Sequence, residues 1–190
     1  MDPIDIAIET FEIAETNLLL SFMGLQPDQI YQQIGPTFNS IGWIVGHCAV
    51  HLHWVIDLTY LNKRTYSQEV CHYFRGGTTK EEIFLNVPPI TFKELVDSYI
   101  DISQSSVEYL QHEGTKMLYT GFAPQPGETL LHQIYRVIFH YMGHMGQVVM
   151  IRRALGNPGR TFVDGVTKHG REKLMQSWKE WWTESRDQFQ

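Results

Sequence analysis

Hydrophobic residues recur along this chain at the three- and four-residue spacing of α-helices, and polar residues fill the positions between them. The first such stretch follows Asp2 and Pro3, which suit the capping position and the first turn of a helix. The second follows Ser40, another favoured capping residue. We therefore expect two long helices, over residues 3–23 and 40–61, with a glycine- and proline-rich break between them.

Three more helices are expected in the second half of the chain. The motif TFKE at residues 91–94 is a capping box, and it predicts a helix over 91–112 that ends before Gly114. Another apolar stretch predicts a helix over 129–155, and a short last helix over 171–189 is rich in tryptophan. Strand patterns are weak throughout, so the predicted fold class is all-α.

The connection over residues 62–90 is long for a compact domain and has no clear periodicity. It is long enough to travel the full height of a helical bundle, so we expect the second and third long helices to run parallel. The result is a four-helix bundle with up-down-down-up order and a short additional C-terminal helix. No internal repeat or composition change divides the chain, which predicts a single domain over residues 1–190.

Composition narrows the possible partners. The chain has 190 residues, of which 43% are hydrophobic and 19% charged, as in ordinary globular domains. A net charge of -6 argues against a nucleic-acid surface, and no apolar run suggests a membrane span. The acidic N-terminal stretch lacks a signal-peptide pattern, and two cysteines are too few for a disulfide scaffold. We expect a cytoplasmic protein that acts on a small molecule, not on nucleic acid or a membrane.

The nine histidines are the one unusual count, and several of them share a helical face. His140 and His144 are four residues apart, so they lie about 40° apart around a helix axis and about 6 Å apart along it. His47 and His51 repeat this spacing on the second long helix, and His132 lies two turns before His140 on about the same stripe. The pattern places imidazoles from two helices toward a common interior.

Histidines that reach the core of a bundle from two helices can hold a metal ion. Zn²⁺, Ni²⁺ and Fe²⁺ all accept imidazole, and the sequence does not choose among them. Three protein ligands leave an open position for water or substrate, which is the catalytic arrangement. A di-iron carboxylate centre is excluded, because the 129–155 helix has no glutamate after Glu128. The competing interpretation is that these are core histidines with ordinary polar partners.

Two motifs carry a resemblance to a known family. The stretches SIGWIVGHCAVH and HYMGHMGQVVMIRRALG, with the long crossover and the TFKEL helix start, resemble the DinB-like (YfiT-like) metalloenzyme superfamily. The family pattern has one histidine in the second helix and His-x3-His followed by Gly-Gln in the fourth, which match His47, His140, His144 and Gly146-Gln147. The resemblance implies an up-down-down-up bundle, a three-histidine site for one divalent metal ion, and a homodimer.

The resemblance also implies a function, because characterised relatives are thiol transferases or isomerases that use bacillithiol, mycothiol or glutathione. A metal ion at the open position would promote loss of the thiol proton, and the thiolate would attack an electrophilic carbon. Two alternatives stay open at this point: a metal-dependent hydrolase, and a non-enzymatic metal-binding or stress-related interaction protein. This chain departs from the family pattern at His51, which could be a fourth ligand, a base beside the site or a packed bystander.

Further residues are candidates for roles around the metal. His51 and His132 are candidate catalytic proton carriers, with His51 favoured because it lies one turn from His47. Gln147 is expected to hydrogen-bond a ligating histidine. Arg75, in the motif FRGG, could bind a carboxylate of a thiol cofactor, although a loop arginine is more often simply solvated.

Two glycines interrupt the fourth long helix close to its histidines. Gly143 and Gly146 each cost about 1 kcal/mol of helix stability relative to alanine. Close packing of a neighbouring helix is the first explanation for them, and a ligand channel is the second. Trp43 and Trp54 could wall such a pocket, although aromatic residues at helical spacing usually belong to the core.

Overall fold

The computed structural model of the protein describes residues 2–77, 87–161 and 163–190. Within these ranges the regular elements are all helical, and the only β-type pairing is an isolated bridge between Gly121 and Thr129. The all-α prediction is therefore confirmed.

Four of the helices are long, and the others are short or peripheral. The short elements α2 and α4 lie in stretches for which the sequence predicted no helix. In chain order the elements are α1 (Pro3–Phe22), α2 (Pro27–Ile30), α3 (Ile41–Leu52), the π-helix η1 (His53–Leu58), α4 (Gln68–Tyr73), α6 (Phe92–Met117), α7 (Leu130–Ala154), α8 (Lys168–Ser185) and the 3-10 turn η2 (Arg186–Gln188).

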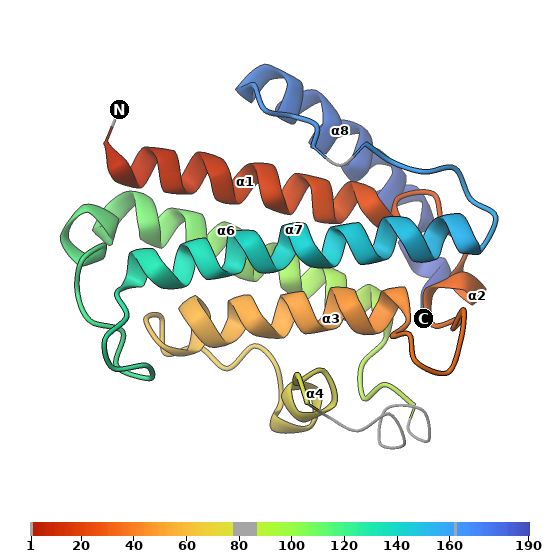
Figure 1. Ribbon diagram of the computed structural model, residues 1–190, viewed down its shortest axis with the longest axis horizontal. Helices are drawn as coiled ribbons and strands as arrows, with labels where there is room; N and C mark the ends of the chain where they lie inside the picture. Colours follow the sequence, from red (N-terminus) through yellow and green to blue (C-terminus); the bar gives the residue numbers. More distant parts are fainter. Residues whose placement is uncertain (1, 78–86, 162) are drawn as a thin grey trace.

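The long helices α1, α3, α6 and α7 lie side by side (Figure 1). In that view α1 and α7 run from left to right, whereas α3 and α6 run from right to left. Both α7 and α6 pack against α1 and α3, so each long helix has two long neighbours. The helix α8 lies outside this group and packs on α1. The face between α3 and α7 is the one that carries the candidate site.

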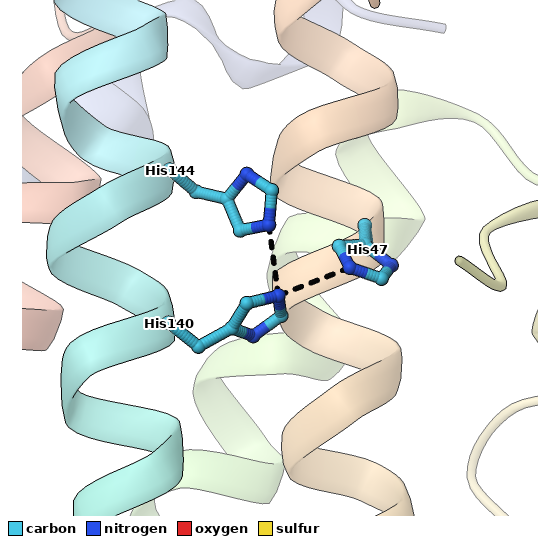
Figure 2. Close-up of side chains that lie close together, drawn as sticks. All are labelled: His47, His140 and His144. Atoms are coloured by element: carbon cyan, nitrogen blue, oxygen red, sulfur yellow. Dashed lines mark hydrogen bonds between the residues drawn. The ribbon is translucent and has the colours of Figure 1, made fainter. Parts of the chain in front are cut away.

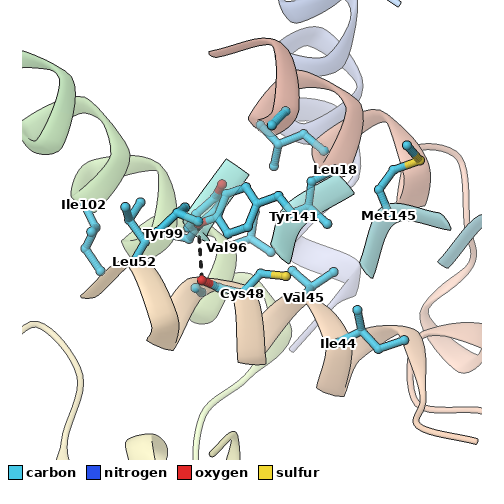
Figure 3. Packing of buried hydrophobic residues seen from close by; sticks show 14 of the residues in the cluster. Leu18, Ile44, Val45, Cys48, Leu52, Val96, Tyr99, Ile102, Tyr141 and Met145 are labelled. Carbon is cyan, nitrogen blue, oxygen red and sulfur yellow. Dashed lines mark hydrogen bonds between the residues drawn. The ribbon is translucent and has the colours of Figure 1, made fainter. Parts of the chain in front are cut away.

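A buried hydrogen bond fixes how α3 and α7 are aligned. The hydroxyl of Tyr141 donates to the backbone carbonyl of Cys48 over 3.2 Å, and both residues are fully buried (Figure 3). The Tyr141 ring also packs on Phe11 of α1 and Tyr99 of α6, with ring centroids 6.1 Å apart in each case. A buried polar group must keep its partner, so this bond resists sliding of one helix along the other. Cys48 and Tyr141 each directly follow a histidine of the candidate site.

The third long helix is longer than predicted. The sequence placed its end before Gly114, but α6 continues to Met117. The missing side chain of Gly114 serves packing, because a Cβ there would lie 2.6 Å from the Ile4 side chain of α1. This glycine is therefore a close-contact position inside the helix, and the prediction that it terminates the helix was wrong.

The second long helix has a change of winding that its hydrophobic pattern did not reveal. It is α-helical over Ile41–Leu52 and π-helical over His53–Leu58, where the continuous helix was predicted to reach residue 61. Among the described helices, only this stretch, 41–58, is long and apolar enough to cross a membrane, and 78% of it is buried inside the molecule. Such burial is typical of the central helix of a protein core.

The last helix begins earlier than expected and covers the end of α1. Thr167 caps α8, whose start at Lys168 is three residues before the predicted one. Its tryptophans form a packing face, since Trp178 and Trp182 are almost fully buried. Trp178 meets the ring of Phe22 edge-on at 6.1 Å.

Candidate metal centre

The start of α3 is built so that one histidine faces α7 in a fixed orientation. The hydroxyl of Ser40 accepts from the Trp43 backbone N–H at 3.2 Å and begins the helix. A Cβ on Gly46 would lie 2.3 Å from the Phe74 ring, so only glycine lets that ring rest on the helix backbone. This contact brings the Phe74 carbonyl to 2.7 Å from Nδ1 of His47. The His47 ring also stacks on Trp43, with centroids 4.9 Å apart and an interplanar angle of 11°.

Two histidines of α7 complete a group of three (Figure 2). Nε2 of His140 lies 3.0 Å from Nε2 of His47 and 2.8 Å from Nε2 of His144. One ring nitrogen from each of the three residues falls within 4.8 Å of the others. The structure thus brings together the three residues that the sequence singled out on two helices, and we call them the histidine triplet.

The hydrogen bonds of the outer ring nitrogens, Nδ1, determine whether the inner ring nitrogens, Nε2, carry a proton. Nδ1 of His144 lies 2.8 Å from Oε1 of Gln147, and an amide oxygen only accepts hydrogen bonds. The Phe74 carbonyl is likewise an acceptor for Nδ1 of His47. Both Nδ1 atoms therefore carry the proton of a neutral imidazole, which leaves the Nε2 atoms of His47 and His144 with lone pairs directed at His140.

His140 stands between these two lone pairs, and its own Nδ1 is buried with no hydrogen-bond partner. If Nε2 of His140 carries a proton, it can satisfy only one of its two neighbours. If it does not, three lone pairs meet at separations of 2.8 and 3.0 Å. Imidazole nitrogens bound to one tetrahedral zinc ion stand about 3.3 Å apart. The three residues therefore fit a cation, which would satisfy all three inner nitrogens at once.

The electrostatic surroundings keep these imidazoles neutral. Burial is the main cause that lowers the pKa of His47, His140 and His144, and for His140 the pKa falls to about 2. Neighbouring histidines add to the effect at His140 and His47, whereas the hydrogen bond that His144 donates to Gln147 opposes it at His144. Neutral imidazole is the form that binds metal ions, so protons compete weakly for this site at neutral pH.

The sequence profile of the DinB superfamily matches residues 10–148, which include the whole histidine triplet. This chain belongs to the DinB superfamily. Neither a curated protein nor a solved structure matches it. The helix α8 of this DinB-superfamily protein lies beyond the matched residues.

His51 lies beside the triplet but does not join it. Its ring centroid is 4.4 Å from that of His140, with the planes nearly perpendicular, yet its nitrogens are not part of the convergent group. Burial, followed by the charges of His47, Arg136 and His144, lowers the pKa of His51 to about 4. Its Nδ1 is buried without a partner. Of the interpretations open at the sequence level, this placement favours a neutral group next to the triplet over a fourth ligand.

His132 is placed away from the triplet. It lies in the first turn of α7, where its exposed side chain accepts a hydrogen bond from the Thr129 N–H at 3.0 Å as part of a capping box. The eight residues between it and His140 correspond to about 12 Å along the helix. The geometry therefore gives no support to His132 as a proton carrier.

Of two further predicted residues, Gln147 contacts the triplet directly, whereas Arg75 follows a residue that does. The predicted hydrogen bond from a candidate ligand to Gln147 is present, at His144. Arg75 directly follows Phe74, whose carbonyl accepts from His47, and its side chain is exposed. Its role toward a thiol cofactor stays a prediction.

The sequence did not identify everything that supports the triplet. The Phe74 carbonyl is a backbone group, which leaves no mark on the amino-acid pattern. Trp43 was expected in the core or in a pocket wall; it is a buried core residue, and the sequence did not show that it also stacks on His47. Its Nε1 donates to the Tyr73 carbonyl at 3.0 Å, which ties α3 to α4. The four-residue spacing between Trp43 and His47 was the one signal available for this pair.

A second histidine group occupies η1, whose first residue, His53, lies two residues after His51. Nδ1 of His53 lies 2.7 Å from Oδ2 of Asp57, and the Thr65 hydroxyl donates to the same oxygen over 2.7 Å. His53 and Asp57 are 2% and 1% exposed. This pair has its polar partners inside the protein and contributes nothing to the triplet.

Proposed function

We propose that this DinB-superfamily protein binds one divalent metal ion, Zn²⁺, Ni²⁺ or Fe²⁺, through His47, His140 and His144. We further propose that it is a metal-dependent S-transferase or isomerase that uses a low-molecular-weight thiol. The observation that supports the metal most strongly is the convergence of three Nε2 atoms whose outer nitrogens, in His47 and His144, already donate to oxygen acceptors. Thiol chemistry is supported by the family resemblance.

When bound, such an ion lowers the pKa of a thiol and supplies a thiolate nucleophile at neutral pH. The residues of the chain hold and shield the site. The Phe74 carbonyl and Gln147 fix the rings of His47 and His144, since each accepts an Nδ1–H bond. Trp43 covers one face of His47 and excludes water from it. His51, whose ring centroid lies 4.4 Å from that of His140, would be a neutral base beside the site for the proton of a bound thiol.

We infer that the four long helices form an up-down-down-up four-helix bundle, to which α8 is added. The directions of α1, α3, α6 and α7 in Figure 1 support this order, as does the packing of α6 and α7 on the same two neighbours. A helix-bundle core is a common setting for metal sites that combine side chains from facing helices. The homodimer and the cytoplasmic location stay predictions.

Cobalt substitution tests the proposed reaction class. The protein is purified, stripped of metal and reloaded with Co²⁺, and its absorption spectrum is followed while glutathione, bacillithiol and mycothiol are added in turn. We expect at least one thiol to change the spectrum in a saturable way, because sulfur entering the site alters the field around the ion. The variant His132→Ala is the matched control on the same helix and should respond as the wild type does.

The competing functions give different results in the same experiment. A site that binds Co²⁺ but responds to none of the thiols would contradict thiol chemistry and leave metal-dependent hydrolysis, in which bound water is the nucleophile. A chain that takes up no metal after reloading would contradict both enzymatic functions. It would leave a non-enzymatic interaction protein whose histidines serve packing alone.

A further inference from the structure

An open cavity of about 650 Å³ lies beside the histidine triplet, between the second half of α7 and the residues that lead into α3. Its size is within the range of small-molecule binding sites in proteins, about 300–1,000 Å³. Its apolar walls include Phe38, Ile44, Met150 and Ile151. The cavity is therefore large enough for a substrate-sized group next to the proposed metal site.

The lining has a consistent chemical character. None of the described residues that line the cavity carries a charge, and the polar ones, Thr37, Asn39 and Gln147, offer only neutral groups. Phe38 and Met150 stand at its edge with 51% and 60% of their surface exposed, although both are large apolar side chains. A charged ligand group would lose water here without gaining an ionic partner, whereas an apolar group would be favoured.

Gly143 gives independent support for a ligand. It lies inside α7, where glycine costs up to about 1 kcal/mol relative to alanine. Close helix packing, the first explanation from the sequence, is wrong for this residue, because a Cβ there would meet no protein atom within 4 Å. Gly143 lines the cavity and directly precedes His144. The missing side chain leaves open the space that a bound molecule would fill.

Gln147 connects this cavity to the histidine triplet. Its side chain lines the cavity, and its Oε1 is 2.8 Å from Nδ1 of His144. A molecule seated in the cavity therefore touches the residue that orients one proposed ligand. The cavity and the triplet form adjoining parts of the face between α3 and α7.

We propose that this cavity binds an uncharged, mainly apolar group of the electrophilic substrate, such as an aromatic ring or a branched alkyl group. The proposal rests on the proposed function for its chemical meaning, since the triplet would act on the atom next to that group. It assigns substrate selectivity to the α7 stretch from Gly143 to Met150 and to the segment before α3. Electrophiles with an apolar body are preferred over those with a charged one.

The test uses two fluorescent probes that share the same rings. N-phenyl-1-naphthylamine is neutral, and 1-anilinonaphthalene-8-sulfonate is the same molecule with one added sulfonate. Both are titrated into wild-type protein, with and without zinc. We expect the neutral probe to bind at least about tenfold more tightly than the sulfonate, a difference of about 1.4 kcal/mol. Equal or tighter binding of the sulfonate would overturn the proposal.

Two variants test whether the neutral probe binds in the cavity. Gly143→Leu fills the open space, and Met150→Glu puts a charge at the edge while keeping a good helix former at an exposed position. Each should weaken binding of the neutral probe at least about tenfold. Ala154→Leu is the matched control, because it adds the same side chain at an exposed position of α7 that does not line the cavity. Unchanged binding by both cavity variants would overturn the proposal.

Metal content and oligomeric state are measured on the same samples. If zinc is retained but no probe binds, the cavity assignment fails and the proposed function stands. If no metal is taken up but probe binding still depends on Gly143, the cavity assignment stands and the proposed function fails. A dimer that both cavity variants dissociate, with no probe bound in the wild type, would show that a second copy covers this face and would overturn the proposal.

Discussion

The continuous helix formed by α3 and η1 contributes histidines to two groups, which satisfy their ring nitrogens in opposite ways. In η1, His53 has a carboxylate partner in Asp57, which in turn accepts from Thr65. In the triplet, His47 and His140 face each other's Nε2 atoms with no carboxylate between them. The first group is complete within the protein, whereas the second places three ring nitrogens around one point.

The difference shows why spacing alone does not identify a metal site. His53 and Asp57 are four residues apart, as are His140 and His144. A buried imidazole needs a polar partner, and the kind of partner decides its role. Where a carboxylate supplies it, the histidine is structural. Where only other imidazoles supply it, a cation is the partner that satisfies them all.

The largest effect on stability is expected from breaking the complete group. Asp57→Ala leaves the buried Nδ1 of His53 without its acceptor and also removes the acceptor of the Thr65 hydroxyl. Removing one member of a buried pair costs about 3–5 kcal/mol, so the free energy of unfolding in urea should fall by about 3 kcal/mol or more. The matched control is Asp187→Ala, which removes an exposed salt bridge to Lys93 and should cost less than about 1 kcal/mol. If the Asp57→Ala variant also failed to bind metal, the two histidine groups would not be independent of each other.

Acid should destabilise the folded, metal-free protein through its buried histidines. The pKa values of His51 and His140 are lowered in the folded state. Below about pH 6.5 these two side chains therefore bind protons in the unfolded chain but not in the folded one. Each of these two histidines can lower the free energy of unfolding by up to about 2 kcal/mol from pH 7 to pH 5, so we expect a total decrease of at least about 2 kcal/mol. Burial raises the pKa of Glu15 to about 7 and acts in the opposite direction, so the comparison is made in a Glu15→Gln background.

The measurement for this pH effect is urea unfolding of metal-free protein at each pH. In the same background, the stability of His140→Ala should depend less steeply on pH. This variant lacks the imidazole whose pKa is lowered most among those of the triplet and His51. Stability of the Glu15→Gln parent that stays level or rises between pH 7 and pH 5 would show that the triplet accepts protons freely.

A smaller effect is expected when the orientation of one ligand is loosened. Gln147→Leu removes the acceptor for Nδ1 of His144 and keeps a side chain of similar length. Loss of such an outer hydrogen bond typically weakens metal affinity about 10–100-fold. A competition titration with a zinc chelator should show a decrease of at least about tenfold, with one ion still bound at saturation. An unchanged affinity would mean that Gln147 does not orient His144.

The two glycines beside the triplet, Gly143 and Gly46, are expected to affect stability with opposite signs when each is replaced by alanine. Gly143→Ala adds a methyl group in open space on a helix, so it should stabilise the fold by up to about 1 kcal/mol. Gly46→Ala places a methyl group against the Phe74 ring and should destabilise it by about 1–3 kcal/mol. Thermal unfolding of the two variants checks both signs. Destabilisation by Gly143→Ala would mean that the protein itself fills this space.

The sequence predicted the parts of the site that depend on helical periodicity. His47, His140 and His144 were found because each lies on an apolar face and two of them repeat after four residues. His132 shares the same stripe, but it lies eight residues, or about 12 Å, before His140 along the helix. His132 is used to cap the first turn of α7.

Other features depended on tertiary contacts that periodicity does not describe. The position of the Phe74 carbonyl depends on the path of the crossover through α4. The π-helical turn at His53 follows a wider winding that a 3.6-residue pattern cannot show. Gly114 had the sequence appearance of a helix end, and only its contact with Ile4 shows that it is an interior packing position.

The central claim is that the triplet, and not the His53 group, holds a metal ion. Its most direct test is the metal content of wild type, His144→Ala and His53→Ala by elemental analysis, after zinc loading and removal of excess, with circular dichroism to show that each is folded. We predict about one ion per chain in the wild type and in His53→Ala, and less than about a tenth in His144→Ala. Less than about a tenth of an ion in the reloaded wild type, or equal content in His144→Ala, would contradict the claim.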